Sequence, residues 1–309
     1  LHNDEWLPWA AYNASISETC PHPPAKSYML PLFTESSNSP SMVWHGMRVI
    51  HQVTKYLNPD QVPAMVVDQP LFTLAKKLQW KFPDSELGEK SFLVILGLMH
   101  TEKMLWSVSG DRLGGSGWTT AISNSGIAPV GRAQAFIGVH HICRTHYIHQ
   151  VSAAALYILM KRAYDEYVRS YSTNNRDGND ALPIEKWLEE LCKAQPQVEY
   201  WLKSMELDLL ILQVTSSVIL TISVLEIIIT PSVMFSTNTP MHAVLFIFQF
   251  VKACRSADFS LYMETLDWLM PWVFALNHSH YSRNLPVHLC DMATLEEMHP
   301  AVFQSGLVW

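Results

Sequence analysis

The chain has 309 residues, of which 49% are hydrophobic and 16% are charged, and its formal net charge is -7 at pH 7. This hydrophobic fraction is large enough to build a core and excludes a wholly disordered chain. The acidic total argues against a nucleic-acid contact spread over the whole chain, although a local basic patch is compatible with it.

The cysteines and the start of the chain indicate an intracellular fragment. No Cys-x-x-Cys pair occurs, so a reduced compartment, nuclear or cytoplasmic, fits better than a disulfide scaffold. Because the chain opens at Leu1 without an initiator Met or a secretory signal, we expect an upstream part to be missing. We expect the five cysteines to be small buried hydrophobes: Cys20, Cys143, Cys192, Cys254 and Cys290.

The first part of the chain is predicted to be an extended Pro- and Ser-rich arm over residues 1–41 and an α/β unit over residues 42–130. The expected elements of this unit are a helix over 42–56, a short buried strand over 64–67, a helix over 71–80 and a strand over 91–96. Strand, helix and strand at this spacing predict a βαβ unit with a parallel pair. Polar side chains just beyond such strands are where α/β proteins usually place their chemistry.

The second part, residues 131–309, is predicted to be mainly helical. The expected helices cover 131–170 (with a break), 184–192, a stretch from about 198, and 259–274. The glycine-rich loop over 110–117 lacks the Walker lysine, so we do not interpret it as a phosphate-binding loop.

A long apolar stretch in the second half carries a single charged residue, Glu226. Residues 209–230 could form a single membrane span, or an ordinary buried helix or strand. A third interpretation is that Val214–Gln249 is a retained intron, because deleting it joins the flanking apolar stripes into one helix. Sequencing the transcript across this join would separate these alternatives.

Several runs along the chain together indicate a family resemblance. They include Met29–Phe33, Leu57–Pro63, Val67–Leu71, Gly114–Thr120, Thr145–Leu156, Pro271–Leu276 and Leu285–Leu289. These runs resemble a multi-copy family of unknown function, abundant in some invertebrate genomes and often near repeats. The resemblance implies descent from a mobile element, but no activity that can be carried over. Asn277 and Asn284 stand where this family tends to have Asp and Trp, which implies a decayed copy.

The polar residues after the two strands are a candidate catalytic site. Clustered carboxylates with an imidazole can bind Mg²⁺ or Mn²⁺ and activate water for phosphodiester cleavage, as in RNase H-like transposases. The alternative is that Asp68 only caps the following helix. The order of elements also counts against an RNase H-like fold. The candidate residues are Asp68, His100, Glu102 and Asp111, with Glu264, Asp267 and Asp291 as later acids that could complete a metal site.

A second candidate lies in the run from His140 to His149. His140, Cys143, His146 and His149 recur every three residues, which suggests zinc. On a helix this spacing drifts by about 60° per step, so no more than two neighbours would share a metal. We therefore favour a polar helix face, with phosphate contacts from Arg144 and His149 as the functional alternative.

Taken together, the sequence predicts an α/β fold with a small parallel sheet followed by a mainly helical half, which a degenerate RNase H-like fold would fit. The leading function is a transposon-derived protein whose ancestral role is metal-dependent DNA cleavage or transposition, with Mg or Mn as the cofactor and DNA as the partner. The alternatives are a non-catalytic interaction protein and a single-span membrane protein. No small-molecule substrate is inferred.

Overall fold

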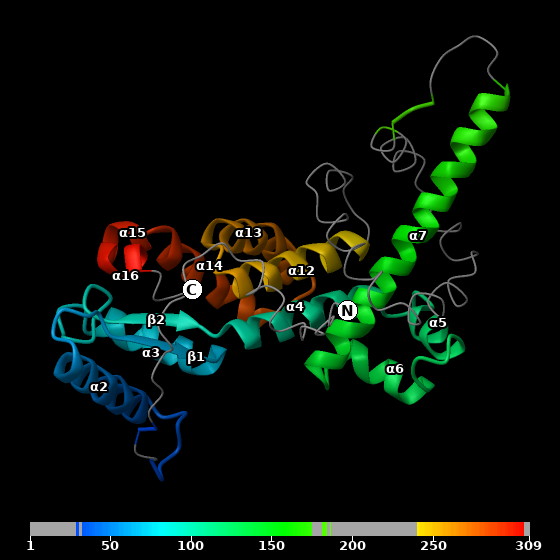
Figure 1. Cartoon of the computed structure of the whole chain (residues 1–309). Helices are drawn as coiled ribbons and strands as arrows, with labels where there is room; N and C mark the ends of the chain where they lie inside the picture. The colour runs from blue at the N-terminus through cyan, green and yellow to red at the C-terminus, as the bar shows by residue number, and fades with distance from the viewer. Residues whose placement is uncertain (1–28, 31–32, 175–180, 184–185, 187–239, 306–309) are drawn as a thin grey trace, which may run out of the picture. The chain divides into compact units, whose positions relative to one another are not determined.

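The computed structural model describes residues 29–30, 33–174, 181–183, 186 and 240–305. Within them the chain is mainly helical with one two-stranded parallel sheet, as predicted (Figure 1). It divides into two compact units. The first unit comprises Leu1–Glu102 and Gln249–Trp309, and the second unit comprises Lys103–Phe248.

The first unit contains the predicted βαβ unit. Strand β1 (Ala64–Val67) and strand β2 (Leu93–Leu96) pair in parallel, with Ala64 opposite Leu93. Helix α3 (Gln69–Lys81) connects them, and α2 (Pro40–Leu57) precedes them. Both helices begin with an oxygen-bearing N-cap side chain and a Pro in the first turn, which satisfies free amides and presets φ.

The prediction that the strand over 64–67 is buried is wrong. All four residues of β2 are buried, whereas Ala64 and Val66 of β1 are exposed, Val66 by 62%. Both strands are edges of this two-stranded sheet, so the difference comes from the helices that cover them. Strand β2 packs against α3 and α14, whereas β1 packs mainly against α2, and the apolar composition of a strand does not show which helices will cover it.

Several helices complete the two units. Helix α4 was not predicted, and its last residues replace the start of the expected glycine-rich loop. The predicted break in the 131–170 helix is the turn between α6 and α7. The remaining helices are α4 (Leu98–Leu113), α5 (Trp118–Asn124), α6 (Val130–Ile137), α7 (Ile142–Asn174), α12 (Pro240–Ser256), α13 (Phe259–Ala275), α14 (Ser279–Ala293), α15 (Leu295–Met298) and α16 (Pro300–Ser305).

The core of the second unit is formed by α5, α6 and α7. Its buried side chains combine large apolar groups with a run of alanines on α7, which lets the helices approach closely. The members of this core include Trp118, Ile122, Phe136, Ile148, Val151, Ala154, Ala155 and Leu159.

Some predictions about single residue types are wrong. Cys143 and Cys290 are exposed instead of buried, and Cys254 is partly buried. Trp80 on α3 and Trp268 on α13 are also largely exposed, at 53% and 45%.

The apolar stretch falls largely outside the described residues. The segment 209–230 and the helices expected over 184–192 and from 198 are not described, except for Lys186. Of Val214–Gln249, the described part is 240–249, which forms the first part of α12 and is buried from Ala243 onward. No helix among the described residues is both long and apolar enough to cross a membrane.

Candidate functional site

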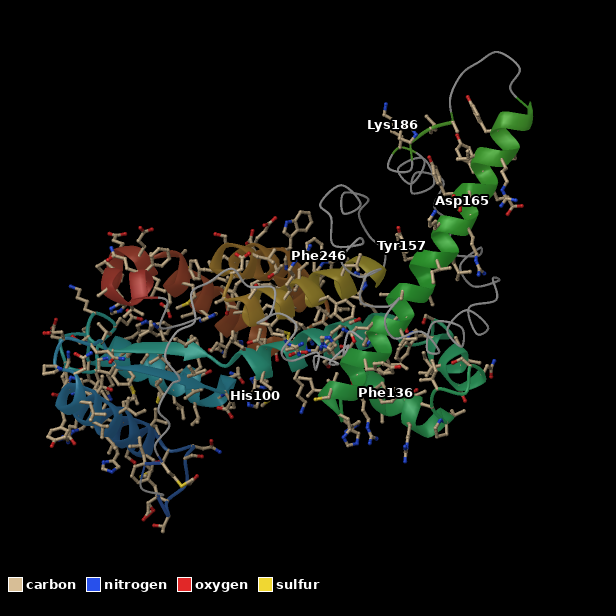
Figure 2. The ribbon with its side chains drawn as sticks, in the orientation of Figure 1. His100, Phe136, Tyr157, Asp165, Lys186 and Phe246 are labelled. Atoms are coloured by element: carbon tan, nitrogen blue, oxygen red, sulfur yellow. The ribbon has the colours of Figure 1, made fainter. Side chains whose placement is uncertain are left out.

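The carboxyl ends of β1 and β2 bring two predicted site residues together with an unpredicted one. Asp68 follows β1 and accepts a hydrogen bond from the amide of Leu71 at 3.2 Å, so it caps α3. His100, labelled in Figure 2, lies on the first turn of α4, and the Tyr281 hydroxyl donates to its carbonyl oxygen at 3.2 Å. Burial and the negative charge of Asp68 raise the pKa of Tyr281 to about 12, so this hydroxyl is protonated at neutral pH.

The other predicted acids lie apart from this edge. Burial, together with the negative charge of Glu102, raises the pKa of the Cys254 thiol to about 12. Asp111 lies on the part of α4 that belongs to the second unit, and Glu264 and Asp267 are exposed on α13. Among the described residues, no three His, Cys, Asp or Glu side chains form a group that could hold a metal ion. One carboxylate at the strand edge does not supply the oxygen ligands that Mg²⁺ or Mn²⁺ needs, so these residues alone do not fit such a metal.

Asp291 belongs instead to a charge network that the sequence did not reveal. The ammonium of Lys76, on α3, lies 2.8 Å from Asp291 Oδ2 and 2.5 Å from Glu89 Oε1, and its side chain is only 5% exposed. Trp80 Nε1 donates to the same Glu89 oxygen at 2.8 Å, and His299 Nε2 lies 2.9 Å from the Glu89 carbonyl oxygen. The network joins α3, the loop before β2, α14 and the residue between α15 and α16, so it stabilises the first unit.

The predicted zinc run, with His140 before α7 and the other three residues on it, is divided between the surface and the core. His140 and Cys143 are exposed, whereas His146 and His149 are buried. This matches the angular drift that the spacing predicts, and the four side chains do not converge on one point.

His149 is held in an aromatic stack. Its ring lies parallel to Trp106 at 4.6 Å and to Trp118 at 5.1 Å between centroids, and it is 1% exposed. Neither ring nitrogen has a hydrogen-bond partner among the described residues. Burial, with a smaller effect of His146, lowers the pKa of His149 to about 3, so the ring is neutral at pH 7. Of the two predicted phosphate-binding residues, only Arg144 is therefore accessible.

Part of the second unit contains basic residues but no acidic ones, a pattern that the motifs considered above did not include. No Asp or Glu occurs anywhere in residues 112–164, although the whole chain is acidic. Asp165, labelled on α7 in Figure 2, is the next acid along the chain. The stretch includes α5, α6 and most of α7, and its basic residues are Arg112, Arg132, Arg144, Lys161 and Arg162.

The turn between α6 and α7 presents one exposed part of this basic stretch. Arg132 on α6, His140 and His141 in the turn, and Arg144 on α7 are all exposed. Val139, directly before the two histidines, has a φ of 52°, a conformation that a β-branched residue rarely adopts. Its side chain is 1% exposed, so core packing holds the strained turn and fixes the backbone of both histidines.

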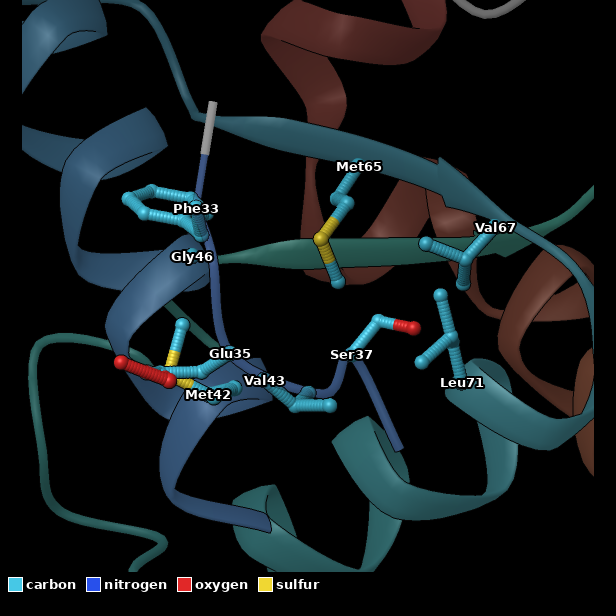
Figure 3. Close-up of a pocket in the computed structure, with 9 residues that line it drawn as sticks. All are labelled: Phe33, Glu35, Ser37, Met42, Val43, Gly46, Met65, Val67 and Leu71. Atoms are coloured by element: carbon cyan, nitrogen blue, oxygen red, sulfur yellow. The ribbon is translucent and has the colours of Figure 1, made fainter. Parts of the chain in front are cut away.

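The first unit also contains an apolar pocket of about 220 Å³ between α2, β1, the start of α3 and the segment before α2 (Figure 3). Glu35 is its one charged lining residue. An apolar lining with so few polar groups can bury an aliphatic group but offers no catalytic pair. The lining residues are Phe33, Glu35, Ser37, Met42, Val43, Gly46, Met65, Val67 and Leu71.

Comparison with known proteins yields one match. A family model described as a domain of unknown function (DUF8702) matches residues 8–307. The search of curated proteins and the search of solved structures gave no match. Because the match extends over nearly the whole length, the chain belongs to the DUF8702 family.

Proposed function

We propose that the protein binds nucleic acid through the second unit, at a surface formed by Arg132, His140, His141 and Arg144, here called the basic turn. The observation that carries the proposal is the absence of any acidic residue from 112 to 164 in a chain of net charge -7. Arginine and histidine donate hydrogen bonds to phosphate oxygens, and local positive potential attracts polyanions even when the total charge is negative.

The proposed contact is small and should be strongly salt-dependent. The two arginines can neutralise about two phosphates, and each neutralised phosphate contributes about -0.9 to the slope of log K against log salt for a duplex. The affinity should therefore fall by about ten-fold between about 50 and about 200 mM salt. Neutral exposed residues would not give this dependence.

Fluorescence anisotropy with a labelled short duplex and a labelled single strand tests the proposal on the full chain. Arg144→Glu and Arg132→Glu should each weaken binding at least about five-fold, because each removes a phosphate contact and adds repulsion. Arg48→Glu is the matched control, since Arg48 is exposed on α2 in the first unit. Equal loss in all three variants would mean that only net charge matters, and would refute a local site.

A second candidate is metal-dependent DNA cleavage at the carboxyl ends of β1 and β2. The position of the Tyr281 hydroxyl, which bonds the His100 carbonyl oxygen and interacts with the charge of Asp68, favours it; the lack of a three-residue ligand group among the described residues counts against it. Nicking of a plasmid in Mg²⁺ or Mn²⁺ is the assay. Asp68→Asn is the informative variant, because asparagine caps a helix as well as aspartate does but carries no charge. Nicking that Asp68→Asn abolishes supports cleavage; DNA binding without nicking supports a non-catalytic interaction protein.

Descent from a mobile element is the broader part of the proposal. The resemblance of the runs described above supports it. Copies of the gene flanked by terminal repeats in the source genome would be the expected finding. A single copy at a conserved chromosomal position, with no repeats, would contradict it.

A further inference from the structure

An exposed tyrosine lies next to the basic turn. Tyr147 is on α7, three residues after Arg144 and six after His141, and it is 42% exposed. Residues three apart on a helix have Cβ atoms about 5–6 Å apart, so Arg144 and Tyr147 start from the same face of α7. Elsewhere on α7, Ile148 and Val151 are buried.

An aromatic ring beside a cation has a specific use in nucleic-acid recognition. The faces of the bases are hidden in a duplex because each base stacks on the next, whereas an unpaired base can stack on a protein ring. Stacking on an aromatic side chain combined with a phosphate contact is the usual way in which proteins bind single strands. The few charges of the basic turn would give only weak duplex binding, so stacking would add the larger part of the affinity.

We infer that the surface formed by His141, Arg144 and Tyr147 binds single-stranded nucleic acid, with one base stacked on Tyr147 and the adjacent phosphate on Arg144. The inference rests on the proposed function and specifies its substrate class. The strained turn at Val139 supports it, because a backbone held by packing loses less conformational freedom on binding. The turn is further held by amide hydrogen bonds of Val139 to the Phe136 carbonyl and of His140 to the Ala135 carbonyl, both 3.2 Å.

The test compares a labelled oligothymidine single strand with a duplex of the same length, using the full chain at low salt. The single strand should bind more tightly. Tyr147→Ala should weaken single-strand binding by about five-fold or more, the loss of one stacked base, and leave duplex binding unchanged. Tyr147→Phe should retain the affinity, because the ring is kept. Tyr56→Ala is the matched control, since Tyr56 is 87% exposed on α2 in the first unit.

The outcomes separate the inference from the proposed function. If Tyr147→Ala leaves single-strand binding unchanged while Arg144→Glu weakens both forms, the inference is wrong and the proposed function stands. If the wild-type chain binds neither form, the proposed function fails and the inference fails with it. Loss of binding in Tyr56→Ala as well would also overturn the inference, because the effect would not be local.

Discussion

Replacing Lys76 by methionine should destabilise the first unit strongly. Methionine has a similar length and keeps the apolar packing of the stem, but it removes the ammonium that lies between Glu89 and Asp291. Breaking a buried ion pair by removing one partner typically costs about 3–5 kcal/mol, because the remaining charge is left without compensation. The two carboxylate side chains are 39% and 22% exposed, so water can solvate them partly and we expect a loss of about 3 kcal/mol.

The pH dependence of this loss identifies its cause. Burial already raises the pKa of Asp291, while Lys76 opposes the shift, so the variant should have a still higher pKa at this carboxyl. A folded-state pKa above the unfolded value favours the protonated folded form, and that stability is lost as the pH rises through the folded pKa. The difference between Lys76→Met and the wild type should therefore shrink as the pH falls from 7 toward about 4.

Urea unfolding followed by circular dichroism measures the free energy of unfolding and, when repeated at several pH values, its pH dependence. Lys77→Met is the matched control, because Lys77 is the next residue on α3 and is exposed. It should change the free energy of unfolding by no more than about 0.5 kcal/mol. The double variant Lys76→Met with Asp291→Asn should recover part of the loss. A Lys76→Met protein within about 1 kcal/mol of wild type at every pH would refute the argument that Lys76 compensates buried carboxylates.

Three further predictions concern buried polar groups and backbone strain. Because the pKa of His149 is lowered to about 3, its contribution to stability is complete above pH 6.5 and declines below it by about 1.4 kcal/mol per pH unit; unfolding at pH 7 and 5 should show a smaller pH effect in His149→Phe. Tyr262→Phe removes the buried hydrogen bond to His288 Nε2 at 2.6 Å and should cost about 1–3 kcal/mol in the same assay. Ala257 has a φ of 56°, so Ala257→Gly should raise the free energy of unfolding by about 0.5–1 kcal/mol.

The local part of the fold was predictable because its signals are local. The βαβ unit follows from two short apolar runs separated by a helix-length segment, and Asp68 followed by Gln69 and Pro70 is a recognisable helix start. Helix α4 was missed because polar residues after a strand were interpreted as a site, although Leu105 and Val108 are spaced for a helical core face. The helical spacing of these apolar residues would have predicted α4, but the polar residues were interpreted as a catalytic site instead.

The charge network was not predictable from one sequence. Lys76 and Asp291 are more than two hundred residues apart along the chain, and their pairing depends on how α14 packs beside α3. Nothing local distinguishes Lys76 from the exposed Lys77. The exposure of β1 is similar, since it depends on which helices cover the strand and not on the composition of the strand.

At the candidate site, the residues that the sequence singled out have other roles, whereas a feature that the sequence contained was overlooked. Motif searching drew attention to residues that could be metal ligands, and the structure shows several of them in other roles, such as Asp68 in a cap and Asp291 in an ion pair. The missing acids in residues 112–164 form no motif, yet they can be read directly from the sequence. Because an electrostatic surface depends on which charges are absent as much as on which are present, the distribution of charge along an acidic chain is the stronger guide to a polyanion site than any single histidine.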